Sequence, residues 1–277
     1  MLFVCAGTGR PPKRRFKHLL RMAAAPSLFK INVIFHKFLV RECYETLSGE
    51  DIHNHLRFVA VNAIIPKEIP QELAPYIIQE RQLLWYNPFM QHNRFCESSA
   101  FFHAWKNPDV FLDTPYIGFV HYDMLVKREA IDFLRQEITA AEARREEVLF
   151  APYCDTARVH LDQFTLGFWD NFVTFYNTIF KTHHTIHTIV DKPIPLYHTF
   201  VLHRATFSRM MAFAELAIPH LFEALGCNTE HLPFQIERMH GLFLALQRED
   251  RSPATWITYI PGIVHEDRLK DNWRGGA

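Results

Sequence analysis

Pro115-Tyr-Ile-Gly-Phe-Val-His-Tyr-Asp-Met124 is the stretch of this 277-residue chain that decides the fold. Its apolar part, 116–120, is typical of a buried strand, and it stops at three functional side chains, His121, Tyr122 and Asp123. Ligands of open α/β sheets collect outside the carboxyl ends of the strands. We therefore expect these three side chains to lie where a ligand would bind.

The residues alone leave two interpretations of this cluster open. An imidazole and a carboxylate can bind a divalent metal, a diphosphate through that metal, or a ribose hydroxyl. Alternatively, Asp123 is the N-cap of a helix, because the segment from about Leu125 to Glu147 has apolar residues at helical spacing among charges.

Segments of strand and helix character alternate on both sides of this stretch. Strands are predicted at 31–35, 56–61, 116–120, 148–151 and 196–202, and helices at 94–106, 125–147, 205–225 and 233–247. The proline-punctuated segment 66–88 is predicted to be loop with short helical turns, and the aromatic residues of 164–180 recur at helical spacing, which is typical of core. We expect an α/β domain with an open, mostly parallel twisted sheet flanked by helices and a helical C-terminal half.

Composition excludes some classes of partner. The 30 lysines and arginines equal the 30 aspartates and glutamates, so no overall positive field would attract nucleic acid. The five cysteines are odd in number and contain no C-x-x-C pair, which favours reduced thiols in the cytoplasm over a disulfide framework. No apolar run approaches the roughly 20 residues that cross a bilayer, so we expect a soluble protein without a transmembrane segment.

The first 30 residues differ from the rest of the chain, because they contain seven lysines and arginines and no acidic residue. Such a segment is a presequence, a tether for peripheral membrane contact, or a disordered basic extension upstream of an alternative start at Met22. We predict three parts: a basic extension over 1–30, an α/β domain over 31–250 and a polar tail over 251–277.

Four segments together resemble a glycosyltransferase family of bacterial capsule and lipopolysaccharide loci. Cys96–Asn107 is similar to its Glu-led helix ending in Trp-Lys-Asn, and Tyr116–Tyr122 to its Tyr-x-Gly-x-x-His-Tyr-Arg-Arg strand end. Leu196–Val201 and Ile236–Met239 resemble its Tyr-Asn-Met-Phe-Ile strand and Ala-Glu-Arg-Leu helix. The resemblance implies a GT-A-like fold and transfer of a sugar from a nucleotide-diphosphate donor to a saccharide or glycan acceptor.

The resemblance also suggests roles for individual residues. His121 and Asp123 would hold the donor diphosphate, directly or through Mn²⁺ or Mg²⁺, although Asp123 and Met124 stand where the relatives carry two arginines. Asp123 and Glu237 are the catalytic candidates, with Glu237 as general base or acceptor ligand. The further donor-binding candidates include Glu97, Tyr122, His198 and Arg238. Independently of the resemblance, His36 and Lys37 are donor-binding candidates because they end the strand predicted at 31–35, where nucleotide-binding α/β folds hold the base and ribose.

Other interpretations stay open at this point. Glu97 could be a solvent-facing helix carboxylate, and Glu237 with Arg238 could form part of an ion-paired amphipathic helix. The lone carboxylate at Asp123 also fits a catalytically inactive nucleotide-sugar or glycan-binding domain. His183 and His187, at i and i+4 of a predicted helix, would suit a zinc-dependent hydrolase.

Overall fold

The computed structural model describes residues 27–92, 95–158, 166–226, 229–250 and 257–266. Residues 1–26 of the expected basic extension, and 251–256 and 267–277 of the expected tail, lie outside these ranges. Within them, no helix is long and apolar enough to cross a membrane.

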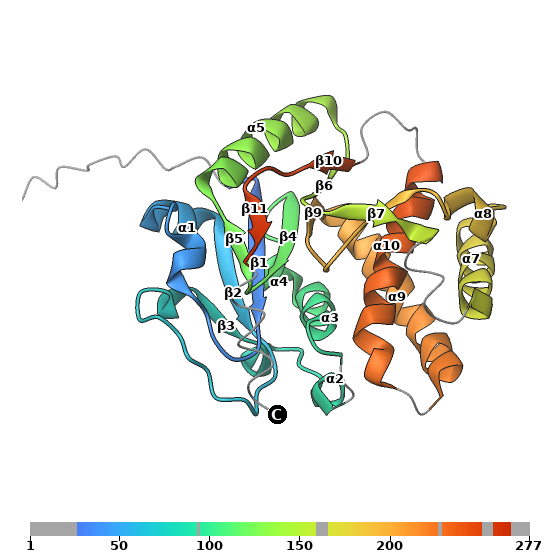
Figure 1. Ribbon diagram of the computed structural model, residues 1–277, viewed down its shortest axis with the longest axis horizontal. Helices are drawn as coiled ribbons and strands as arrows, with labels where there is room; N and C mark the ends of the chain where they lie inside the picture. Colours follow the sequence, from blue (N-terminus) through green and yellow to red (C-terminus); the bar gives the residue numbers. More distant parts are fainter. Residues whose placement is uncertain (1–26, 93–94, 159–165, 227–228, 251–256, 267–277) are drawn as a thin grey trace, which may run out of the picture.

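The central element is a seven-stranded sheet in the order β10-β6-β9-β4-β1-β2-β3 (Figure 1). Its strands are β1 (Phe29–Phe35), β2 (Leu56–Ala60), β3 (Ile77–Gln79), β4 (Tyr116–His121), β6 (Leu149–Ala151), β9 (Phe200–His203) and β10 (Ile257–Tyr259). Strand β9 runs antiparallel to both of its neighbours, and the other strands of this sheet are parallel to one another. The expectation of a mostly parallel α/β sheet is confirmed.

Helices cover both faces of the sheet (Figure 1). The helices are α1 (Gly49–His55), α2 (Pro88–His92), α3 (Ser98–Lys106), α4 (Pro108–Phe111), α5 (Arg128–Arg144), α7 (Leu166–Phe180), α8 (Ile186–Ile189), α9 (Arg204–Leu225) and α10 (Leu232–Asp250), with short 3₁₀ turns at Arg41–Tyr44, Ala74–Tyr76, Glu80–Gln82 and Thr229–His231. Two small antiparallel sheets pair β5 (Met124–Val126) with β11 (Ile263–His265) and β7 (Cys154–Thr156) with β8 (Pro193–Pro195).

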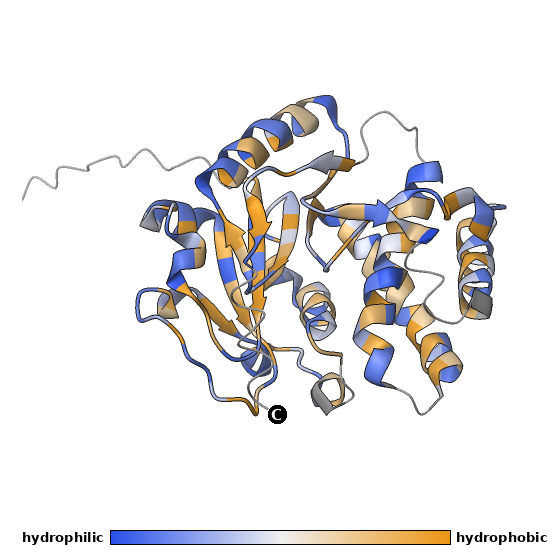
Figure 2. Cartoon of the chain, viewed as in Figure 1, coloured by the Kyte–Doolittle hydropathy of each residue, from blue (hydrophilic) through white to orange (hydrophobic). Residues whose placement is uncertain are grey.

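Alternation along the strands divides the core into two layers. In β4, Ile117 and Phe119 face the layer that contains α3, α7, α9 and α10, whereas Tyr116 and Val120 face the layer with α1 and α5. Gly118 lies between them, and a Cβ there would come 2.8 Å from Val201 Cγ2. Figure 2 shows the strands of the main sheet as mostly hydrophobic, as expected for strands buried on both faces. The aromatic stripe of α7 is core, as predicted: Trp169 and Tyr176 are fully buried.

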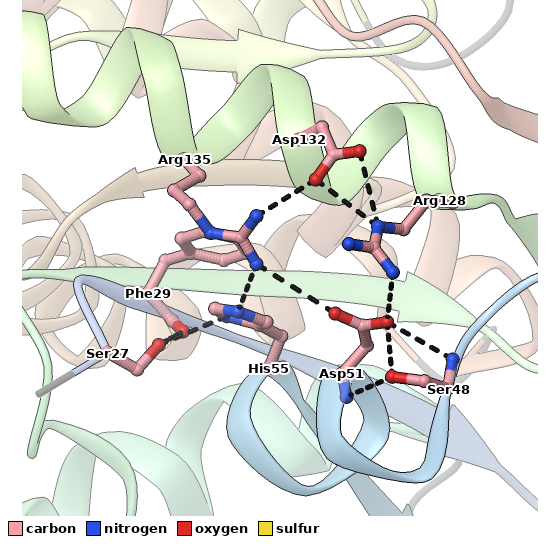
Figure 3. A network of polar contacts seen from close by, with 8 residues as sticks. All are labelled: Ser27, Phe29, Ser48, Asp51, His55, Arg128, Asp132 and Arg135. Atoms are coloured by element: carbon pink, nitrogen blue, oxygen red, sulfur yellow. Dashed lines mark hydrogen bonds and ion pairs between the residues drawn. The ribbon is translucent and has the colours of Figure 1, made fainter. Parts of the chain in front are cut away.

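A polar network joins the two helices of the α1–α5 layer (Figure 3). Asp51 of α1 accepts a hydrogen bond of 2.8 Å from Arg128 of α5, and its carboxylate also caps its own helix by accepting the Ser48 backbone N–H at 3.1 Å. Arg135 of α5 lies 3.2 Å from His55 Nε2. Charged side chains at the ends of these helices thus hold them together outside the apolar layer.

Several elements differ from the sequence predictions. Helix α5 begins at Arg128, not near Leu125, because Met124–Val126 forms β5 and pairs with β11. Lys127 is the N-cap, so the interpretation of Asp123 as a helix cap is wrong. The segment expected as a tail contributes β10 to the main sheet and β11 to the small one.

Candidate functional site

The site lies at one edge of the main sheet. The parallel strands β1, β2, β3 and β4 all end there, and the segment that precedes the antiparallel β9 reaches the same edge. His36, Glu80 and His121 stand at the ends of β1, β3 and β4, and His198 lies just before β9. The topology thus collects side chains from distant parts of the sequence at the edge where α/β sheets bind ligands.

His36 and Glu97 form an ion pair at this edge. Glu97 occupies the N-cap position of α3, but its side chain does not cap the helix and instead contacts His36 Nε2. Burial lowers the pKa of His36, yet the charge and hydrogen bond of Glu97 outweigh this and raise it. Burial likewise raises the pKa of Glu97, and the charges of His36 and His121 more than reverse that effect. The pair therefore favours the cationic form of the imidazole at the end of β1.

His121 is the electrostatic centre of the cluster. It affects the pKa values of Glu97, His198 and Glu237, so its imidazole lies within reach of all three. Its Nε2 is buried and has no hydrogen-bonding partner in the described part of the chain. A buried polar atom of this kind retains its capacity to bind a ligand.

His198 and His240 form a second, uncharged pair. His240 Nδ1 lies 3.2 Å from His198 Nε2, and Phe101 packs against both rings. Burial lowers the pKa of His240 to about 3, and burial together with His240 lowers the pKa of His198 well below its ordinary value. The sequence prediction missed His240, although it lies three residues after Glu237 and therefore near the same helix face.

Glu237 projects from α10 toward the segment before β9. Its Oε1 accepts the backbone N–H of Tyr197 at 2.8 Å. Burial raises the pKa of Glu237, with the Tyr197 hydrogen bond and His121 acting in the opposite direction. Neighbouring Arg238 donates to Phe234 O at 2.8 Å, and burial lowers its pKa. A carboxyl group with a raised pKa is suited to accept a proton near neutral pH.

Asp123 has a partner that the sequence did not suggest. Its Oδ2 lies 3.1 Å from His265 Nε2, because the pairing of β5 with β11 brings His265 beside the end of β4. Its Oδ1 is buried without a hydrogen-bonding partner among the described residues. Among those residues, no group of three or more His, Cys, Asp or Glu side chains is placed to hold a metal ion.

The remaining donor-binding candidates lie beside this cluster. Tyr122 is 8% exposed and packs edge-on against Phe38 at 5.1 Å between ring centroids, so it belongs to the core. Lys37 is exposed and lines a cavity of ≈ 590 Å³ together with Phe38 and Glu68. The cavity adjoins the end of β1.

Two further polar groups at this edge were not predicted. Lys67 Nζ donates to the carbonyls of Asn62 and Ile65 at 2.6 and 2.9 Å, and burial lowers its pKa to about 8. Its charge affects the pKa of His36. Glu80 is buried and accepts a hydrogen bond of 2.7 Å from Ser99 of α3. Neither residue lies in a patterned segment, so periodicity could not identify them.

The proposed zinc ligands do not share a helix. His187 lies in the short helix α8, whereas His183 precedes it in a loop, and both are exposed. The i, i+4 premise is therefore wrong. His184, between them, instead lies 2.7 Å from Asp250 of α10.

No family model and no curated protein matches this sequence. Among solved structures, the fold is similar to the WbbM bifunctional glycosyltransferase apo structure, with a TM-score of 0.54 and 11% sequence identity over 84% of this chain. The match covers 44% of that chain, so the present chain spans less than half of it. This likeness confirms the expected α/β glycosyltransferase fold; the particular family is not confirmed.

Proposed function

We propose that this protein is a glycosyltransferase that moves a sugar from a nucleotide-diphosphate donor to a saccharide or glycan acceptor. The observation that carries the proposal is the set of groups that His121 influences electrostatically: Glu97, which is paired with His36, and Glu237, a carboxyl group with a raised pKa. Glycosyl transfer needs a cation for the leaving diphosphate and a base for the acceptor hydroxyl. The fold likeness to a glycosyltransferase supports the same reaction class.

We assign binding of the donor to the basic residues His36, Lys37 and Lys67. His36 and Lys37 follow β1, and Lys67 lies close enough to His36 to affect its pKa. Their charges would offset the negative charge that develops on the diphosphate as the bond to the anomeric carbon breaks. Glu97 orients and charges His36, while His121 and Arg238 complete the donor side.

The acceptor end is assigned to Glu237. One of its oxygens accepts the Tyr197 N–H, which fixes the carboxylate and leaves the other oxygen to take the acceptor proton. As the acceptor oxygen bonds to the anomeric carbon, its proton passes to Glu237 and the nucleoside diphosphate departs with the bonding electron pair. Positioned bases of this kind typically contribute about 10²–10⁴-fold to a rate.

The test is release of nucleoside diphosphate from a panel of UDP-, GDP-, ADP- and dTDP-sugars, with a saccharide mixture as acceptor and with or without Mn²⁺. We expect one donor class to turn over, and Glu237→Gln to slow it by about 100-fold or more. Glu129→Gln, an exposed carboxylate on α5, is the matched control and should retain the rate. Full activity of Glu237→Gln would refute the role of Glu237; binding of a nucleotide sugar without turnover would identify an inactive binding domain.

A further inference from the structure

Two consecutive residues before β9 adopt a backbone conformation that side chains disfavour. Tyr197 has φ = 57° and His198 has φ = 48°, both in the left-handed region. Non-glycine residues held there cost about 1–3 kcal/mol each and persist where surrounding contacts enforce them. Here Glu237 accepts the N–H of Tyr197, and Thr199 Oγ1 donates to the carbonyl of Tyr197 at 2.9 Å.

The strained turn sends the two side chains in different directions. His198 is 4% exposed and packs against Phe101 and His240, whereas Tyr197 is 45% exposed at the same edge of the sheet. The turn therefore displays the tyrosine ring beside the polar groups of the site.

Hydrogen-bonding groups surround the displayed ring. Its centroid lies 6.1 Å from the imidazole of His265 and 5.7 Å from the ring of Tyr153, which stands nearly perpendicular to it. His265 is paired with Asp123, whose other oxygen is buried and lacks a hydrogen-bonding partner in the described ranges. A partly exposed aromatic ring beside a phenol and beside an imidazole that is itself paired with a carboxylate matches a pyranose, which has a C–H face and hydroxyls around its rim.

We propose that Tyr197 is the platform on which the acceptor saccharide stacks, with the Asp123–His265 pair binding its hydroxyls. The identification of this sugar as an acceptor rests on the proposed transferase function. Glu237, bonded to the backbone of the same tyrosine, then lies beside the bound sugar, so one residue positions both the base and its substrate. Asp123 is thereby assigned to the acceptor side of the site.

The test measures saccharide binding in the absence of any donor. Saturation-transfer NMR of the full chain with a panel of methyl hexopyranosides compares wild type, Tyr197→Asn and Tyr197→Phe. Asparagine tolerates the left-handed region, so this variant removes the ring without adding strain, and an unchanged Tm verifies its fold. We expect at least tenfold weaker binding in Tyr197→Asn and near wild-type binding in Tyr197→Phe. Tyr259→Asn, which removes a tyrosine 65% exposed on β10, should have no effect.

Kinetics separate this proposal from the transferase function. With a nucleotide sugar that the protein uses as a substrate, Tyr197→Asn should raise the KM for the saccharide about tenfold and leave the KM for the nucleotide sugar unchanged. If saccharide binding depends on Tyr197 but no nucleotide sugar is turned over, the proposed stacking role of Tyr197 is supported and the proposed transferase function is refuted. If no glycoside of the panel binds, or if Tyr197→Asn binds as wild type does, the platform proposal is wrong.

Discussion

Replacing Glu97 with glutamine tests the electrostatic basis of the site. The substitution keeps the shape of the side chain and a hydrogen bond to His36, but it removes the charge that raises the pKa of His36. Burial and the charge of Lys67 then outweigh the remaining opposing charge of Glu80, so the pKa of His36 falls and the imidazole becomes neutral near pH 7. The variant should lose both stability and affinity for a nucleoside diphosphate.

The size and pH dependence of the stability loss follow from the pair. The His36 and Glu97 side chains are 12% and 22% exposed, and hydrogen bonds between charged groups contribute about 1.5–3 kcal/mol, so we expect a loss of about 2 kcal/mol. The pKa of His36 is raised in the folded state. Its contribution to the free energy of unfolding is therefore complete below the pKa of the unfolded chain, near 6.5, and is lost as pH rises through the folded pKa. The pKa of Glu97 is lowered, so the contribution of Glu97 to the free energy of unfolding is present above about pH 4.3. The loss should be largest between about pH 4.3 and 6.5.

Urea denaturation at pH 6 and pH 9 measures the free energy of unfolding of both proteins. The loss at pH 9 should be smaller than at pH 6, because the attraction between the two charges disappears as pH rises through the folded pKa of His36, while Glu97 remains ionised. Glu72→Gln is the control, because Glu72 is 59% exposed and lies 3.9 Å from Arg41, and its loss should stay below about 0.5 kcal/mol. An equal loss at both pH values, or an equal loss in the control, would refute the reasoning.

Three more predictions concern charge and packing, two of them in the rest of the fold and one at the donor end of the site. Burial raises the pKa of Asp51, but the hydrogen bonds from Ser48 and the charge of Arg128 lower it overall. Asp51→Asn should therefore lower the free energy of unfolding by about 2 kcal/mol at pH 7, and by progressively less as pH falls through the folded pKa. Urea unfolding at pH 7 and pH 2.5 measures the difference. Gly118→Ala should lower stability by about 1–3 kcal/mol in thermal unfolding, because its Cβ would clash, whereas Gly49→Ala, with no atom within 4 Å, should not. Calorimetry should show affinity for UDP falling about tenfold between pH 7 and 9 as Lys67 loses its proton near pH 8, and Lys67→Met should flatten this dependence. Equal affinities of Lys67→Met and wild type at pH 7 would contradict that role.

Long, strongly patterned elements could be predicted from the sequence. The strand at 116–120 and the helices at 205–225 and 233–247 correspond closely to β4, α9 and α10. Each of these segments has enough apolar residues at the spacing of its own secondary structure to define a buried face. Strand β3 could not be recognised, because it has only three residues and follows Pro75 closely.

The site was predictable where it depends on strand ends. His36 and His121 were expected at one edge because parallel strands end together, and the structure places them there. The partner of Asp123 was not predictable, because His265 reaches it only through the pairing of β11 with β5. The contact between His198 and His240 likewise depends on how α10 packs against the turn before β9.

Mass spectrometry of a glycoside acceptor, combined with quantitation of released nucleoside diphosphate, tests the transferase proposal most directly. We predict that the acceptor gains one glycosyl unit for each nucleoside diphosphate released, and that Glu237→Gln slows both by about 100-fold. No gain of mass with any nucleotide sugar, or an equal gain in Glu237→Gln, would contradict the account.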